Sequence, residues 1–226
     1  MPKKPSTHNE GSSNKTSISI ESIKTEDGSQ TNVANGDIYV NTGEQTRDKH
    51  YNIALNWDGK TRMRFFDLSK QDLHSISLKG ADLRKANLME ANLKKADLSR
   101  TDLTAARMQQ ANMELTILEN AICVGVKLEG AYMVNADLRG CNLGGANLKD
   151  ANMMGADLSN ANLSGCILDS AILAGAKLVG ADLTSATLIA TDLSNADLSK
   201  AILRGTLVVR KQLLQAEFLP DDTLLA

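Results

Sequence analysis

From Leu68 to Leu203, every fifth residue is a large apolar residue, and 28 such positions follow one another without an insertion or a deletion. Leu fills 23 of these positions, Met fills four, and Cys123 fills one. Two residues before each of them stands a small residue in most units, which is Ala in 19 of the 28. The unit therefore reads A-(D/N)-L-x-x, as in residues 81–85.

A period of five fits neither a straight α-helix nor a straight strand. A five-residue step rotates about 140° around an α-helix, which would scatter the leucines over the whole cylinder. In a strand, the same step would send successive leucines to opposite faces. A chain that bends by a quarter turn once per unit buries both the Leu and the Ala series, and four units then close one square coil. Stacked about 4.8 Å apart, the 28 units make seven coils, a rod of about 34 Å.

This pattern resembles the pentapeptide-repeat protein family over residues 63–207. A run of 28 consecutive units in one register is a highly specific signal. The resemblance implies a right-handed quadrilateral β-helix; the handedness is implied by the family and not by the spacing. We therefore expect an all-β solenoid of about seven coils, with a short C-terminal α-helix and a mostly disordered N-terminal tail.

The segment before the repeat divides into two parts. Residues 1–50 are polar and have few apolar anchors, so we expect a disordered tail. A weak hairpin is the alternative there, because Thr16–Ile23 and Asn32–Val40 alternate between polar and apolar residues. Residues 51–65 contain the single Trp, Trp57. We expect this segment to cap the first coil, because a solenoid end exposes core side chains and unpaired strand edges.

The repeat itself is assigned to residues 66–206, and a different pattern follows it. Residues 207–226 begin with grouped apolar residues among straight-chain helix formers, which predicts a short capping helix that ends before Pro220, followed by a tail. Such a helix could cover the last coil within one chain. Alternatively, it could join two chains as a homodimer.

The sequence offers no catalytic constellation. The carboxylates that precede the central Leu, such as Asp82 and Asp157, recur with the repeat and exchange with Asn, so they are interpreted as strand surface. His8, His50 and His74 are far apart, and no Cys/His pair has the spacing of metal ligands. We therefore expect a protein that is not an enzyme and that has no cofactor and no metal.

The cysteines and the ends bear on the compartment. Cys123, Cys141 and Cys166 all fall on inward positions, where they are expected to be small buried hydrophobes. The first residues contain no apolar run, so we expect no secretory signal peptide, and no stretch approaches the roughly 20 apolar residues of a membrane span. We expect a cytoplasmic protein without a membrane span.

An uninterrupted register places residues 20 apart on the same side of the solenoid. On one side, three consecutive central positions form a core ladder of methionines, Met113, Met133 and Met153. The outward residues of the same region are apolar, and they are the candidate partner-binding face: Leu115, Tyr132, Val134, Met154, Ile172 and Ala174. An apolar patch of roughly several hundred Å² often marks an interaction site. The alternative is that these residues are ordinary scattered surface apolar groups.

Charge separates two functional hypotheses. The first is a non-enzymatic protein-interaction scaffold that presents one face to a protein partner, with a regulatory role as one form of it. The second comes from the family resemblance: a DNA mimic that inhibits or protects gyrase, a type II topoisomerase, which requires a strongly negative rod. Here residues 66–206 hold 14 basic and 16 acidic residues. The basic residues of the early coils lack interleaved aromatic residues, so no nucleic-acid binding is expected.

Overall fold

The structure, a computed structural model, describes residues 31–34, 37–40 and 43–219. Contacts within the chain divide it into two units, with the division after Val40. The second unit holds α1 (Gly43–Leu55), the stacked coils and α2 (Arg210–Leu213). Each unit is described by itself below.

The first unit contains a hairpin of two short strands, β1 (Thr31–Ala34) and β2 (Asp37–Val40). The strands are antiparallel, with Thr31 opposite Val40. The dipeptide between them in the sequence is Asn35-Gly36, which favours two-residue hairpin turns. The hairpin thus forms within the segment that the sequence analysis assigned to one strand; the other expected strand, residues 16–23, lies outside the described residues.

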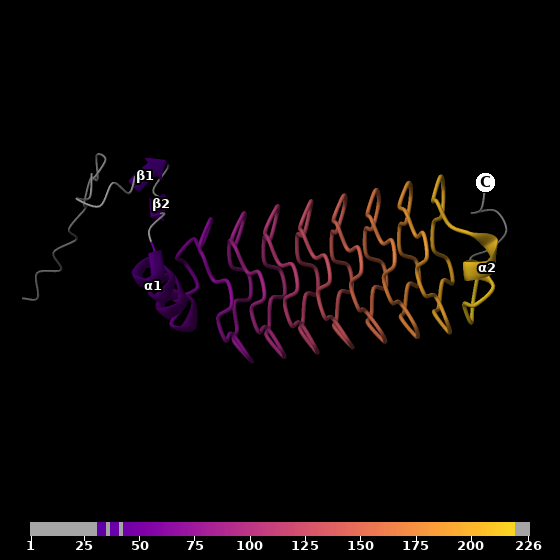
Figure 1. Cartoon of the computed structure of the whole chain (residues 1–226), viewed down its shortest axis with the longest axis horizontal. Helices are drawn as coiled ribbons and strands as arrows, with labels where there is room; N and C mark the ends of the chain where they lie inside the picture. Colours follow the sequence, from indigo (N-terminus) through magenta and orange to yellow (C-terminus); the bar gives the residue numbers. More distant parts are fainter. Residues whose placement is uncertain (1–30, 35–36, 41–42, 220–226) are drawn as a thin grey trace, which may run out of the picture. The chain divides into compact units, whose positions relative to one another are not determined.

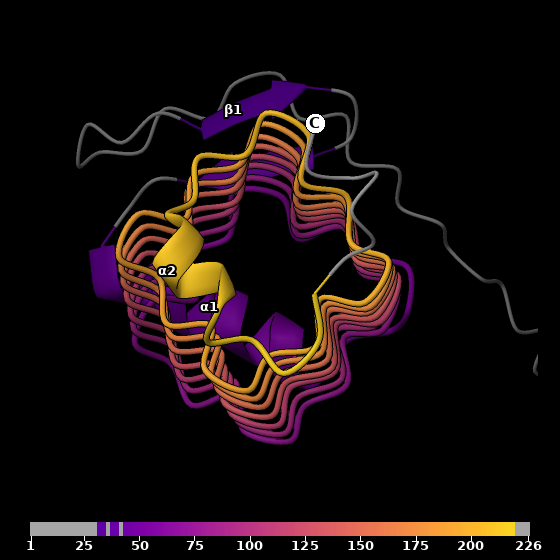
Figure 2. The same cartoon turned by 90° about the vertical axis from the view of Figure 1, so that its right-hand side faces the viewer.

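The second unit is a solenoid in which each coil pairs with the next one. Parallel bridges join residues 20 apart, as between Asp67 and Asn87, and these bridges form four columns that begin at Asp67, Asp72, Ser77 and Asp82. We name the four sides after these residues. Figure 1 shows the stacked coils, and Figure 2 shows the four sides from one end. The prediction of a repeat solenoid with residues 20 apart in register is confirmed.

One hydrogen-bonding scheme repeats along the solenoid. We number the positions of a unit 1 to 5, so that the Ala is position 1 and the central Leu is position 3. The N–H groups of positions 3 and 5 donate to the next coil, as from Leu88 to Arg107 O (2.6 Å) and from Glu90 to Gln109 O (2.9 Å). The N–H of position 2 donates to the preceding coil, as from Asn87 to Phe66 O (2.8 Å). Position 4 donates no backbone–backbone hydrogen bond in the described coils.

The corners of the square are tight turns. The N–H of position 1 donates to the carbonyl of position 3 in the preceding unit, as from Ala81 to Leu78 O (2.9 Å). Position 5 has a positive φ, for example +66° at Gly155 and +58° at Asp150. A positive φ at the second central residue is the mark of a type II turn, which favours Gly or Asn there. A corner that recurs once per unit explains why five residues, and not four or six, make one side.

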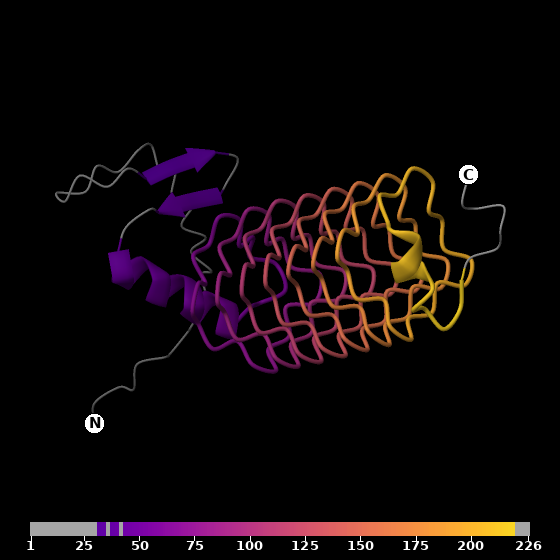
Figure 3. The ribbon, with the colours of Figure 1, turned by 45° about the vertical axis from the view of Figure 1, so that its right-hand side comes forward.

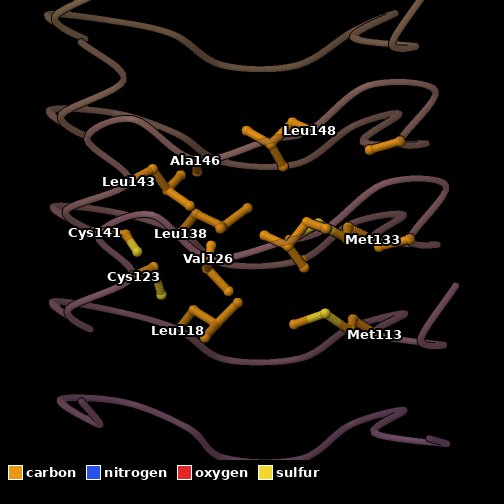
Figure 4. Close-up of a cluster of buried hydrophobic side chains, with 14 of the residues drawn as sticks. Met113, Leu118, Cys123, Val126, Met133, Leu138, Cys141, Leu143, Ala146 and Leu148 are labelled. Atoms are coloured by element: carbon orange, nitrogen blue, oxygen red, sulfur yellow. The ribbon is translucent and has the colours of Figure 1, made fainter. Parts of the chain in front are cut away.

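The core is formed by positions 1 and 3, which are buried on all four sides except at the two ends, where Gln71, Ile76 and Thr206 at position 1 are half-buried. Figure 4 shows Met113, Met133, Cys123 and Cys141 among the leucines of the interior. Where Thr replaces Ala at position 1, its hydroxyl finds a backbone acceptor, as in the bond from Thr116 Oγ1 to Leu93 O (2.8 Å). Such satisfied hydroxyls are tolerated in an apolar interior.

Helix α1 covers the N-terminal end of the coils. The ring of His50 stacks on Phe66 at 4.1 Å between ring centroids, and its Nδ1 accepts a hydrogen bond from Asp67 N–H (3.0 Å). The hydroxyl of Tyr51 donates to Asp72 O (2.9 Å). The helix begins at Gly43, inside the segment that was expected to be disordered. Its sequence is polar and shows no apolar stripe, so these tertiary contacts stabilise it.

The repeat begins one unit earlier than the sequence indicated. Met63 is fully buried, and its N–H donates to Asp82 O (2.8 Å), which is the bond that a position 3 residue makes. The sequence analysis included residue 63 in the family resemblance over residues 63–207, but it placed this residue in the capping segment 51–65 and assigned the repeat to residues 66–206.

The C-terminal end is covered by a helix of four residues only, followed by a return to strand. Figure 3 shows α2 across this end of the coils. The side-chain amide of Gln212 donates to Leu188 O (2.9 Å) and Thr191 O (2.8 Å), which fixes the helix on the last coil. Phe218 then pairs in parallel with Asp197, 21 residues earlier instead of 20. The predicted capping helix is therefore much shorter than expected.

Within the described residues, no helix has both the length and the apolar character needed to cross a membrane.

Candidate partner-binding face

The structure places all six residues of the candidate face on the Asp72 side. Tyr132 and Ile172 occupy position 2 of their units and belong to one column of bridges, with Asn152 between them. Val134, Met154 and Ala174 occupy position 4 of the same three units. Leu115 is at the corner of the coil before them. We call this set the Tyr132 face: Leu115, Tyr132, Val134, Met154, Ile172 and Ala174.

The members of the Tyr132 face differ in exposure. Leu115, Tyr132 and Met154 are exposed, with 41%, 43% and 46% of their surface accessible. Val134, Ile172 and Ala174 are half-buried. Leu115, Tyr132 and Met154 are therefore the most accessible apolar side chains of the face.

A rigid backbone supports this face. The side chains of Met113, Met133 and Met153 are fully buried behind it. Their N–H groups donate to the carbonyls of the next coil: Met113 to Tyr132 O at 2.6 Å, and Met133 to Asn152 O at 2.7 Å. Tyr132 is thus held at a paired strand position, whereas Leu115 and Met154 lie in the tight corner turns that adjoin such positions.

Three successive coils of the Asp72 side are free of charge around five of the six residues of the face. The units 131–135, 151–155 and 171–175 have nine outward residues, and none is ionisable in the physiological range: Tyr132, Val134, Asn135, Asn152, Met154, Gly155, Ile172, Ala174 and Gly175. In the coil before these three, Glu114 stands next to Leu115 and pairs with Lys94 (2.6 Å); in the coil after them, Asp192 is charged. An uncharged surface loses little hydration on contact, which favours association with an apolar partner surface.

The sequence analysis did not include one further exposed apolar residue beside this face. Ile117 follows Leu115 across one corner and is exposed on the neighbouring Ser77 side. The signal was present in the sequence, since Ile117 stands at position 2, where most units have Asp or Asn.

The recurring carboxylates have a structural role, as the sequence analysis interpreted them. Asp157 Oδ1, for example, accepts hydrogen bonds from the N–H (3.0 Å) and hydroxyl (2.6 Å) of Ser159 within its own unit. In the described part of the chain, no three His, Cys, Asp or Glu side chains come together as metal ligands would. His50 belongs to α1 and is buried against Phe66 of the first coil, whereas His74 is exposed on the Asp72 side of that coil.

The three cysteines are free and buried. Burial raises the pKa of the Cys166 thiol to about 12. The pKa of Cys123 is also raised, chiefly by its hydrogen bond with Cys141 and then by burial. Protonated thiols without access to solvent are poor nucleophiles and poor metal ligands.

A shallow hollow of about 570 Å³ lies beside α1, apart from the Tyr132 face, and is lined by Asp48, Lys49, Asn52, Ile53, Asn56, Asp58 and Thr61. Asp58 in this hollow accepts hydrogen bonds from the N–H groups of Lys60 (2.8 Å) and Thr61 (2.7 Å), which lower its pKa. Its carboxylate is therefore part of a turn.

The uninterrupted unit, the 20-residue columns and the buried Leu and Ala ladders define a solenoid of five-residue repeats. The family profile described as "Pentapeptide repeats" matches the chain in eight copies, over residues 67–104, 96–133, 131–169 and 166–205. This chain belongs to the pentapeptide-repeat family.

Solved structures of the same family resemble the chain. HetL, a heterocyst differentiation regulation protein from the cyanobacterium Nostoc sp. strain PCC 7120, is 29% identical, with 80% of this chain and 94% of HetL covered (TM-score 0.27). QnrB1, a plasmid-mediated fluoroquinolone resistance protein, is 19% identical, with 64% and 80% covered (TM-score 0.48). The protein alr5209 from Nostoc is 31% identical, with 49% and 84% covered (TM-score 0.27). No curated protein matches the sequence.

Proposed function

We propose that this protein is a non-enzymatic interaction scaffold, a right-handed quadrilateral β-helix of about seven coils that presents the Tyr132 face to a protein partner. The observation that carries the proposal is that Tyr132 and Met154 are exposed within three coils of uncharged surface, with a third exposed apolar side chain, Leu115, in the coil before them. We assign a regulatory role to the scaffold, because a surface without reactive groups changes the activity of its partner only by binding to it.

The Tyr132 face is too small to supply a whole interface. Three coils spaced about 4.8 Å apart span only about 14 Å along the rod. A stable interface buries about 800 Å² on each partner. The partner therefore has to extend past the Tyr132 face, and the exposed Ile117 beside Leu115 gives an apolar continuation around the corner.

A pull-down with two matched double variants tests this proposal. Tyr132→Asp with Met154→Asp places charge at positions 2 and 4 of adjacent coils on the Asp72 side. Ile167→Asp with Ile189→Asp makes the same changes at the same positions on the Asp67 side, where both residues are also exposed (41% and 53%). We expect loss of captured partner only with the first pair. Equal capture by both folded variants would remove the Tyr132 face as the binding site.

The acidic excess of the later coils favours a second candidate function. Residues 108–206 hold six basic and ten acidic residues, a net charge of −4. A negative rod could act as a DNA mimic toward a type II topoisomerase such as gyrase. A gyrase supercoiling assay separates the candidates: inhibition or drug protection at micromolar protein supports the mimic, and the scaffold proposal expects neither.

A further inference from the structure

A second exposed apolar surface lies on the Asp67 side, in its last three coils. Its residues are at positions 2 and 4: Ile167, Ile189, Leu207 and Val209, with 41%, 53%, 58% and 58% of their surface accessible. Ile167 and Leu207 belong to one column of parallel bridges, with Thr187 between them. We call these four residues the Ile189 face. Three of them are more exposed than any side chain of the Tyr132 face.

The charges beside the Ile189 face change sign along the rod. One coil before Ile189, Asp169 Oδ1 accepts a hydrogen bond from Ile189 N–H (3.0 Å), which holds this carboxylate at the edge of the face. After the last coil, Arg210 and Lys211 begin α2 and are exposed. None of these three charged side chains forms a salt bridge with a described residue. Unit 146–150, which precedes the face, holds one cation and one anion and has no net charge.

We propose that the Ile189 face binds the same face of a second copy of this chain, with the two rods antiparallel. Consider a two-fold axis that runs along the strand of residues 186–190. It brings residues at the same position, one coil before and one coil after the axis, opposite each other. Leu207 of each copy then faces Ile167 of the other, and Ile189 faces Ile189. The apolar residues of the face therefore match one another in this arrangement.

The charges favour a second copy over other partners. The same axis places Arg210 of each copy beside Asp169 of the other, so that this ion pair forms twice. A partner of a single charge sign would be repelled at one end of the face. A partner that matches both ends has its charges in the opposite direction along the rod, and an antiparallel copy has this property by symmetry.

The small size of the Ile189 face makes the dimer weak. Three coils spaced about 4.8 Å apart span about 14 Å along the rod, whereas a stable interface buries about 800 Å² on each partner. The contact is lateral, so it differs from a joining of two rods end to end through α2. It also lies on another side than the Tyr132 face, so that failure of either proposal leaves the other standing.

Sedimentation equilibrium of the full-length chain tests the inference. We expect the average mass to rise from monomer toward dimer between about 10 μM and about 1 mM. Ile189→Asp places two like charges opposite each other at the axis and should keep the protein monomeric. Val124→Asp is the matched control, because Val124 is also exposed at position 4 (38%) but lies on the Asp82 side. A monomer at the highest concentration overturns the inference, as does equal dimerisation of both folded variants.

A charge exchange tests the antiparallel arrangement. Arg210→Asp should weaken the dimer by roughly tenfold, because two carboxylates then meet at each end of the contact. Adding Asp169→Arg reverses both charges of the pair and should restore the dimer. Absence of this restoration, in a double variant that denaturant unfolding shows to be folded, overturns the antiparallel pairing. A dimer that is lost with Leu214→Asp and kept with Ile189→Asp lies at the end of the rod, which overturns the inference as well.

Discussion

The N–H of Asp67 donates a hydrogen bond to Nδ1 of His50 across the junction of α1 and the first coil, at 3.0 Å. The acceptor has to be unprotonated. Burial lowers the pKa of His50 below its ordinary 6.5; the nearby Asp67 carboxylate opposes this shift, and Lys49 adds to it. The stability of the N-terminal cap at this junction therefore depends on pH.

Acidification should weaken the cap. Because the folded-state pKa of His50 is lower than its unfolded value, its contribution is complete above about pH 6.5 and is lost as the pH falls through the folded-state pKa. We expect the free energy of unfolding, measured with denaturant, to fall over this window. The His50→Ala variant should be less stable at neutral pH and should show a flatter pH dependence there. An unchanged slope would assign the effect to other groups.

Replacing Gln212 by Ala should destabilise the C-terminal end by roughly 1–3 kcal/mol, because the carbonyls of Leu188 and Thr191 lose their donor. Val209 N–H would also lose the side-chain oxygen that accepts its hydrogen bond at 3.1 Å. Denaturant unfolding measures the change. Gln215→Ala is the control, since the Gln215 side chain forms no hydrogen bond with the described residues; equal effects of both variants would contradict the capping role.

Gly155 and Gly175 allow two causes of the preference for glycine at a corner, backbone strain and a side-chain collision, to be compared. Both have φ of +66°, so an Ala at either corner is strained by about 1 kcal/mol. At Gly155 the added Cβ would also collide with the side-chain oxygen of Asn135, whereas nothing lies near Gly175. Because the exposed side chain of Asn135 can rotate away, we expect Gly155→Ala to lower the thermal midpoint only slightly more than Gly175→Ala does.

A second substitution checks the steric part of that prediction. Asn135→Gly removes the side chain without straining the backbone at residue 135, whose φ is +54°. Combined with Gly155→Ala, it should remove the excess loss and leave a double variant close to Gly175→Ala in stability. Additive effects of the two substitutions would exclude the collision as the cause.

The cysteines should not react with alkylating reagents while the protein is folded. Cys123, Cys141 and Cys166 are buried, and the raised pKa values of Cys123 and Cys166 keep these thiols protonated at neutral pH. Mass spectrometry should find all three thiols unmodified without denaturant and modified with it. Rapid labelling of any one under native conditions would indicate local opening of the coils.

The solenoid could be predicted from the sequence because burial recurs at the same two positions of every unit. The register alone also brought Tyr132, Met154 and Ile172 to one side, as the bridges confirm. The exposure of each residue could not be predicted, since it depends on neighbours in the adjacent coils: Met154 is exposed, whereas Val134 at the equivalent position is half-buried.

The two ends were predicted less well, because single tertiary contacts decide them. Helix α1 has a polar sequence, and it is held by the contacts of His50 with Phe66 and Asp67. The shift of one residue at Phe218 follows from the insertion of α2, which Gln212 fixes on the last coil. A pattern that repeats every five residues carries no information about such contacts.

The hydrogen-bonding scheme of the unit also gives the rod an electrical direction. Each unit sends two N–H groups toward the C-terminal end and one toward the N-terminal end. The unbalanced peptide dipoles add along the axis, so that amide hydrogens are in excess at the C-terminal end and carbonyl oxygens at the N-terminal end. The sign is opposite to that of an α-helix, whose free N–H groups are at its N-terminus. Anionic groups are therefore stabilised by the backbone field at the C-terminal end of this rod, and cationic groups at its N-terminal end.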